Sequence, residues 1–135
     1  MLATEFLHGQ GMGNQLFAYV TTRMLAKKLG YDFGIKGLRC AGDSRVNKKG
    51  FYFMSLDYGK EVPDDLTRYD EYRHGLHTDD YLRTDIRLTD KKLLSIPDNH
   101  IIYGNLQSED YFGDELELVK EWLKVRVMHE HDETN

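Results

Sequence analysis

The stretch Leu7-His8-Gly9-Gln10-Gly11-Met12-Gly13-Asn14-Gln15-Leu16-Phe17 carries the most information about the fold. It follows an apolar run that begins at Leu2, and an amphipathic run continues from it to Leu29. This order predicts a strand, a glycine-rich turn and a helix. Such a unit brings backbone N–H groups to the carboxyl edge of a sheet, where α/β proteins hold anionic or hydroxylated ligands. We therefore expect this turn to contact a ligand.

The spacing of the glycines argues against the common nucleotide-binding loops. Gly9, Gly11 and Gly13 alternate, whereas the fingerprint Gly-x-Gly-x-x-Gly needs a glycine where Asn14 stands. Asp32 lies near the distance expected for a ribose-binding acid, but it does not stand at the end of the expected second strand. Two simpler interpretations stay open: the glycines permit a tight turn, and Asn14 is the N-cap of the helix.

The hydrophobic pattern predicts an α/β domain with a parallel sheet and flanking helices, of the Rossmann-like type. The expected strands are 2–7, 31–35 and 100–103, and the expected helices are 14–29 and 108–127, with a helical turn at 90–94. Gly30 is expected to end the first helix, and Ser108 is expected to cap the second. Gly113 interrupts the first turns of the second helix, so regular helix is expected only from about residue 114. In the second helix, an apolar stripe of Phe112, Leu116, Val119 and Leu123 is expected to face the core.

Residues 36–89 show little periodicity and are expected to be irregular. Phe51–Met54 is a candidate strand within them. Aromatic and basic side chains gather in the rest, namely Tyr69, Tyr72, Arg73, His74, His77 and Tyr81. They are suited to lining a groove for a sugar acceptor, but the favoured alternative is a solvated insertion with some aromatics packed on the sheet. The histidine pairs 74/77 and 129/131 lack the further ligands that a zinc site needs, so no metal site is predicted.

Composition narrows the class of protein. The net charge of −5 argues against non-specific binding of nucleic acid. No apolar run reaches the ~20 residues of a membrane span, and no secretory signal is recognisable. The single cysteine, Cys40, cannot form an internal disulfide, which is typical of a reducing compartment. We expect a cytoplasmic location.

Two segments resemble a known family. Gly11-Met12-Gly13-Asn14-Gln15-Leu16-Phe17-Ala18-Tyr19 resembles the Gly-x-Leu-Gly-Asn-Gln-Met/Leu-Phe-x-Tyr-Ala signature of glycosyltransferase family 11, the α-1,2-fucosyltransferases. Ile96 to Phe112, which includes Gly104-Asn105-Leu106-Gln107-Ser108-Glu109, resembles the family's strand followed by Gly-Tyr-Phe/Trp-Gln-Ser-Glu-Lys-Tyr-Phe. The resemblance covers roughly residues 4–35 and 82–125.

The chain also departs from the family's pattern. Gly11 stands where animal members have an arginine, as in bacterial members, and Asp110 replaces a lysine. Asn105 and Leu106 replace an aromatic pair. The His-x-Arg-Arg-x-Asp motif, which grips the diphosphate of the nucleotide sugar in the family, is absent from this sequence.

The resemblance implies an inverting, metal-independent transfer of L-fucose from GDP-fucose to a galactoside hydroxyl, without a cofactor. It implies a two-lobed GT-B enzyme of which this chain is the N-terminal lobe. The residues that the resemblance assigns to the donor or the acceptor are Gly11, Met12, Gly13, Asn14, Gln15, Gln107, Ser108 and Glu109. His8, beside the turn, is a candidate catalytic base, or a hydrogen-bonded loop histidine.

At 135 residues the chain has the length of one domain. We expect residues 1–127 to form the lobe, with 36–89 as an acceptor-side insertion, and 128–135 to be a polar tail. We also expect the isolated chain to be inactive, because it lacks the donor-binding lobe. Two alternatives stay open: a non-catalytic module that binds a sugar or nucleotide sugar, and a half-protein that acts only with a partner chain.

Overall fold

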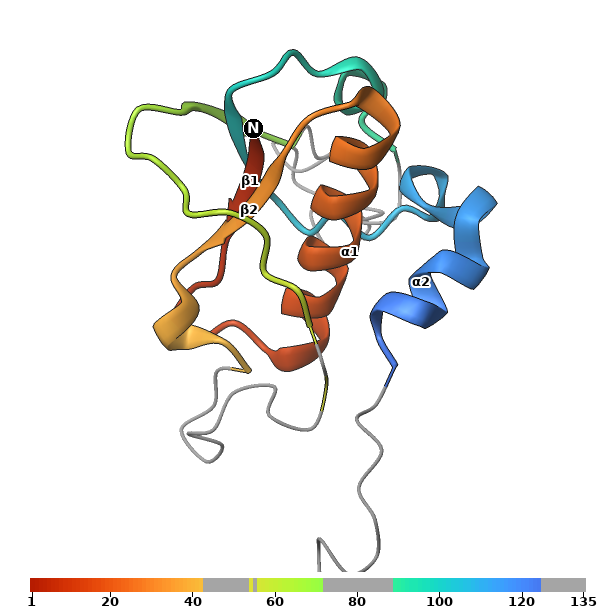
Figure 1. Cartoon of the computed structure of the whole chain (residues 1–135), viewed down its shortest axis with the longest axis horizontal. Coiled ribbons are helices and arrows are strands. Elements are labelled where there is room, and N and C mark those ends of the chain that lie inside the picture. The colour runs from red at the N-terminus through yellow and green to blue at the C-terminus, as the bar shows by residue number, and fades with distance from the viewer. Residues whose placement is uncertain (43–53, 55, 72–88, 125–135) are drawn as a thin grey trace, which may run out of the picture.

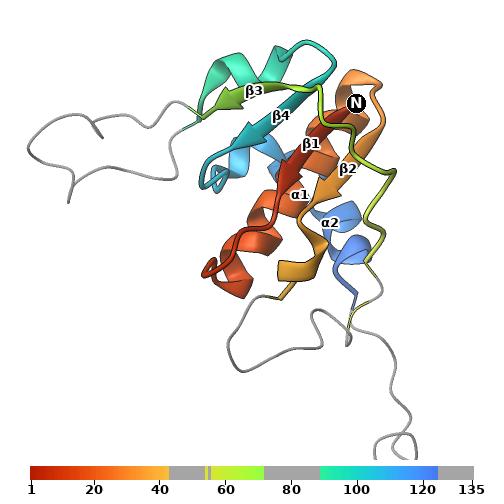
Figure 2. The ribbon, with the colours of Figure 1, turned by 90° about the vertical axis from the view of Figure 1, so that its left-hand side faces the viewer.

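A computed structural model of the chain describes residues 1–42, 54, 56–71 and 89–124. These residues form a four-stranded parallel sheet in the order β2-β1-β4-β3. The strands are β1 (Leu2–Glu5), β2 (Phe33–Lys36), β3 (Thr67–Asp70) and β4 (His100–Tyr103). Helix α1 (Met12–Leu29) packs against β1 and β2. The short helix α2 (Leu116–Trp122) lies on the side of α1 that faces away from the sheet (Figure 1, Figure 2). The predicted α/β class with a parallel sheet is confirmed.

Helix α1 begins earlier than its sequence pattern predicts. Gly11, in an extended conformation, is its N-cap, and the Gln15 N–H donates the first helical bond to the Gly11 carbonyl at 3.0 Å. No side chain caps this end among the described residues. The prediction that Asn14 is the N-cap is therefore wrong. The C-terminal end is as predicted, because Gly30 adopts a left-handed φ of 82° and its N–H reaches the last carbonyls.

The second predicted helix is broken. Ser108 caps a 3₁₀ helix, Glu109–Tyr111, by accepting from the Asp110 N–H. A second 3₁₀ turn, Gly113–Glu115, follows before α2 begins. Leu116, predicted to face the core, is 48% exposed, so the predicted stripe fails at that residue. The breaks fall at Phe112 (φ −148°, ψ −2°) and Glu115 (φ −131°, ψ 41°), where the backbone leaves helical geometry.

The remaining predicted elements are close to those observed. Strand β4 has its predicted bounds, β1 ends two residues earlier and β2 begins two residues later than predicted. A 3₁₀ helix, Lys91–Ser95, occupies the predicted helical turn and is capped by Asp90. Strand β3 falls within the segment 36–89 that was expected to be irregular, so that expectation is wrong at β3. Within the candidate strand 51–54, only Met54 is described.

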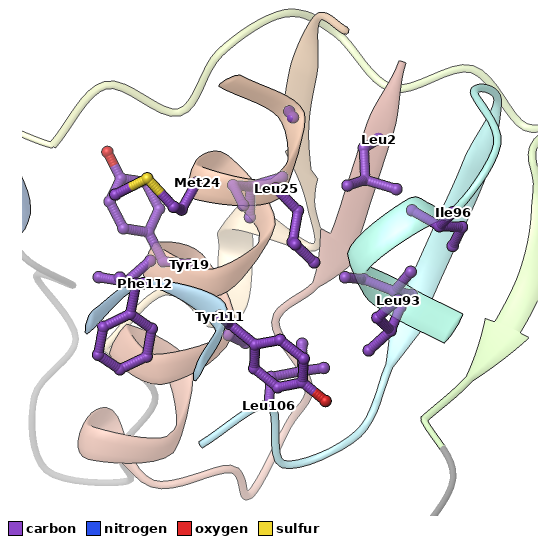
Figure 3. Close-up of a cluster of buried hydrophobic side chains, with 14 of the residues drawn as sticks. Leu2, Tyr19, Met24, Leu25, Leu93, Ile96, Leu106, Tyr111 and Phe112 are labelled. Carbon is purple, nitrogen blue, oxygen red and sulfur yellow. The ribbon is translucent and has the colours of Figure 1, made fainter. Parts of the chain in front are cut away.

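The core lies between α1 and the sheet (Figure 3). Strand β1 is buried on both faces, as expected of a central parallel strand. Met24 and Leu25 come from α1, Leu93 and Ile96 from the 3₁₀ helix before β4 and the residue that follows it, and Leu106 and Tyr111 from the segment after β4. No described helix has both the length and the apolar content needed to cross a membrane.

Candidate functional site

The two segments that carry the motifs meet in space. The Gln107 Nε2 donates a hydrogen bond of 2.8 Å to the Asn14 Oδ1, across 93 residues of sequence. Asn14 lies in the first turn of α1 and Gln107 follows β4, so both lie beside the carboxyl ends of the central strands. We call this place the motif edge: Gly11, Met12, Gly13, Asn14 and the segment Gln107–Glu109.

The motif edge presents the N-terminus of α1. The N–H groups of Met12, Gly13 and Asn14 precede the first helical hydrogen bond, so they are available to a ligand. A Cβ built on Gly13 meets no described atom within 4 Å, and one on Gly11 meets only the Asn14 Nδ2 at 3.9 Å. Packing among the described residues therefore does not require glycine at either position.

Beside the motif edge lies a cavity of about 580 Å³, lined by Phe17, Gln107, Ser108, Glu109, Asp110 and Phe112. Ser108 is buried and accepts from the Asp110 N–H at 3.2 Å, and its hydroxyl also contacts the Thr89 hydroxyl. Glu109 is exposed at the rim. The side chain of Ser108 thus shapes the turn, while Gln107 and Glu109 face the space around it.

Gln15 has a structural position rather than a ligand-facing one. Its side chain is fully buried, its Nε2 donates to the Cys40 carbonyl at 2.8 Å, and its Oε1 accepts from the Gly42 N–H at 2.7 Å. These bonds tie α1 to the segment after β2. Gln15 therefore stabilises the position of α1 at the motif edge through its contacts with the segment after β2.

His8 is exposed in the turn after β1 and lines neither of the cavities described in this section. Tyr69 lies in β3, where its hydroxyl donates to Asp90 at 2.7 Å. The other members of the aromatic and basic group, residues 72–81, lie outside the described residues, as do the histidines at 129 and 131. The described part of the chain holds no group of three metal-ligating side chains.

A buried polar network that the sequence did not predict holds the segment carrying Gln107. Glu71, directly after β3, is 6% exposed. Its Oε1 accepts from the Leu106 N–H at 3.0 Å and its Oε2 from the Tyr111 hydroxyl at 2.7 Å. Burial, and then the bond to Glu71, raises the pKa of Tyr111. Leu106 has a left-handed φ of 54°, so the Glu71 bond helps to fix an unfavourable backbone next to Gln107.

A second cavity, of about 310 Å³, lies at the ends of the strands, and we call it the strand-end cavity. Its polar lining comes from Glu5 in β1, Arg68 and Asp70 in β3, Glu71 after β3, and Tyr103 in β4. In the sheet order β2-β1-β4-β3, β1 lies beside the strand that follows it in the chain, and β4 lies beside the strand that precedes it. The chain order therefore breaks between the neighbours β1 and β4. Open α/β sheets bind ligands in the crevice at such a break in strand order.

The lining of the strand-end cavity is organised by two pairs. The Tyr103 hydroxyl donates to the Glu5 Oε1 at 2.6 Å, and burial followed by this bond raises the pKa of Tyr103 to about 12. Arg68 donates from Nε and Nη2 to Asp70, and its guanidinium carbon lies 4.1 Å from the Tyr103 ring centroid. The sequence carried one signal for this site, the carboxylate of Glu5 at the end of a buried strand.

The fold and these two cavities define the class: an α/β protein with a parallel sheet and polar side chains along the carboxyl edge of that sheet. Comparison with known protein families, with characterised proteins and with solved structures finds no match to this chain. The function therefore has to be argued from the site itself.

Proposed function

We propose that this chain forms the N-terminal lobe of a two-lobed GT-B glycosyltransferase that moves L-fucose from GDP-fucose to a galactoside hydroxyl with inversion. The observation that carries the proposal is the hydrogen bond between Asn14 and Gln107. Each residue belongs to one of the two segments that resemble the α-1,2-fucosyltransferases. Their contact is what a shared substrate site built from both segments would require.

The motif edge suits part of this chemistry. The reaction forms a bond from the acceptor oxygen to C1 of fucose while the bond from C1 to the diphosphate oxygen breaks, and negative charge accumulates on the departing GDP. The N–H groups of Met12 and Gly13 at a helix N-terminus favour such charge. The Asn14 amide N–H₂ and the Gln107 carbonyl oxygen supply a donor and an acceptor for sugar hydroxyls.

The same edge is incomplete as a catalytic site. Glu109 and Asp110 place carboxylates beside the neighbouring cavity, and they oppose binding of a diphosphate. Arginines make the strong bidentate contacts to phosphates, and the His-x-Arg-Arg-x-Asp motif is absent from the sequence. The cations must come from a second lobe or a partner chain, so we propose that this chain alone does not transfer fucose. The proton of the acceptor hydroxyl goes to a base, for which His8 is the candidate.

Gly13 provides the sharpest test. Glycine costs a helix ~0.5–1 kcal/mol relative to alanine, and a Cβ there meets no described neighbour. Gly13→Ala should therefore leave the fold as stable as before or slightly more stable. If the donor approaches the backbone here, the same methyl group should weaken binding of GDP-fucose by about tenfold or more.

The experiment is an NMR titration of the chain with GDP-fucose, following the amide signals of Met12, Gly13 and Gln107. Gly113→Ala is the matched control, because a Cβ there meets only the Glu109 Cβ at an ordinary 3.6 Å. Binding that survives Gly13→Ala, or that shifts only amides elsewhere, would contradict the donor assignment. Turnover of GDP-fucose and lactose by the isolated chain would contradict the proposal that the lobe is inactive alone.

A further inference from the structure

The strand-end cavity is a second site with a different chemistry from the motif edge. It is formed where three parallel strands end: Glu5 closes β1, Asp70 closes β3 and Tyr103 closes β4. Its volume of about 310 Å³ is at the lower end of the ~300–1,000 Å³ typical of ligand sites. That space suits a ligand of monosaccharide size and is too small for a nucleotide sugar.

The charges around the cavity select among such ligands. Three carboxyl groups, of Glu5, Asp70 and Glu71, face one guanidinium, that of Arg68. The Arg68 guanidinium already donates three hydrogen bonds of 2.9–3.1 Å to the Asp70 carboxylate. An anionic ligand would therefore meet uncompensated carboxylates, whereas a cationic ligand would be attracted.

Glu5 is the carboxylate best placed to receive a cation. It is half-buried, and its one hydrogen bond in the described structure is to Oε1, from the Tyr103 hydroxyl. A carboxylate has room for about four hydrogen bonds, so Glu5 keeps acceptor capacity toward the cavity. The Tyr103 bond fixes the orientation of the carboxylate before a ligand arrives, which lowers the entropy lost on binding.

The rest of the lining provides for hydroxyl groups. Asn105 and Gln10 bring amide side chains to the cavity, and each amide group is both a donor and an acceptor for hydroxyl groups. Both donors and acceptors therefore line the space. We propose that the strand-end cavity binds a small hydroxylated ligand that bears a protonated amine, with Glu5 receiving the ammonium group.

This proposal does not depend on the transfer reaction, and it places a ligand on residues other than those of the motif edge. The test uses three hexoses that have the same ring configuration but differ in charge: glucosamine is cationic, glucose is neutral and glucuronate is anionic. Each is titrated into the full chain at a mildly acidic pH, and the amide signals of Gly104 and Asn105 are followed. We expect glucosamine to bind most tightly, glucose more weakly and glucuronate not detectably.

Two variants should move the affinity for glucosamine in opposite directions. Glu5→Gln keeps an acceptor for the Tyr103 hydroxyl but removes the charge, and it should weaken binding about tenfold. Arg68→Gln removes the competing cation and frees Asp70, so it should tighten binding about threefold. Asp64→Asn, which removes a carboxylate that is 95% exposed and lies outside the cavity, should change nothing.

Opposite shifts cannot arise from a general loss of structure, because that would weaken binding in both variants. The proposal is overturned if none of the three hexoses binds, if glucuronate binds as tightly as glucosamine, or if Glu5→Gln and Arg68→Gln shift the affinity in the same direction. Gly13→Ala should leave glucosamine binding intact, which separates this site from the donor assignment at the motif edge.

Discussion

The two halves of this sheet are held together in different ways. In the first half, β1, α1 and β2 join through apolar contacts, with Leu2, Met24 and Leu25 almost fully buried. In the second half, β3 is joined to the segment after β4 by polar side chains, with Glu71 and Asp90 both buried and hydrogen-bonded. The first half is mainly a local hydrophobic unit, and the second adds to the shared apolar core a polar network between distant residues.

The difference bears on where function can be placed. Glu71 reaches Leu106 and Tyr111 across 35 and 40 residues of sequence, and the backbone that it holds leads directly to Gln107. Buried polar groups stabilise one arrangement only when every partner is present. The second half therefore sets the position of Gln107, while the first half supplies the rigid α1 to which Gln107 binds.

The largest expected loss of stability follows from a substitution in the first half of the sheet. Met24→Ala removes a side chain with no exposure, and large-to-small changes in a core typically cost ~2–5 kcal/mol. We expect a loss of that size in the free energy of unfolding, measured by urea denaturation. Leu116→Ala is the control: its side chain is 48% exposed, and it should change stability by no more than ~0.5 kcal/mol. Equal losses in the two variants would contradict the described core.

In the second half of the sheet, the loss of a single hydroxyl group should lower the free energy of unfolding. Tyr111→Phe removes the donor to Glu71 Oε2 and the acceptor of the Asp90 N–H, so two buried groups lose a partner. Leaving the buried Glu71 oxygen without this donor costs ~1–3 kcal/mol by itself, so we expect the free energy of unfolding of the variant to fall by at least that amount.

Tyr31→Phe is the matched control for that substitution. The Tyr31 hydroxyl donates one hydrogen bond of 2.9 Å to the Ile96 carbonyl, so its loss should cost ~0.5–1.5 kcal/mol. A Tyr31 variant as unstable as the Tyr111 variant would show that the Glu71 network adds nothing to an ordinary hydrogen bond.

The same contrast explains what the sequence could predict. The periodicity of Val20 and Met24 and the stop at Gly30 predicted α1, and the short apolar run at 100–103 predicted β4. Strand β3 was missed because it is a short edge strand with Arg68 and Asp70 exposed, so it lacks an apolar signal. Its pairing with β4 is a long-range contact, and no local pattern encodes it.

The candidate site was predictable only in part, for a similar reason. The motifs identified Asn14 and Gln107, but not that one binds the other, because the hydrogen bond depends on the turn at Leu106. Gln15 was assigned to the ligand because it belongs to the Gly-Asn-Gln motif, and only the structure shows both ends of its side chain bound to backbone groups. The strand-end cavity joins three strands, so its residues are scattered along the chain.

The third prediction concerns alkaline pH. The pKa of Tyr103 is raised to about 12 in the folded chain, from an ordinary value of 10. Above about pH 10 the unfolded chain loses this proton while the folded chain keeps it. Stability that is fully present below pH 10 is therefore lost as the pH rises toward 12.

Tyr103→Phe should make this alkaline loss of stability shallower. It should not abolish the loss, because the pKa values of Tyr69 and Tyr111 are raised in the same direction. The measurement is the free energy of unfolding in urea at several pH values between about 9 and 11. An unchanged slope in the variant would contradict the raised pKa of Tyr103.

The smallest expected effect is at the contact between the two halves. Asn14 is exposed and Gln107 is half-buried, so Asn14→Ala and Gln107→Ala should each change stability only slightly. A double-mutant cycle isolates their hydrogen bond, for which we expect a coupling of ~0.5–1 kcal/mol. Repeating the cycle in the Tyr111→Phe background tests the connection between the halves. If the Glu71 network positions Gln107, the coupling should shrink toward zero in that background, although neither partner has been changed. A coupling that stays the same would mean that Gln107 is positioned to bind Asn14 without the Glu71 network.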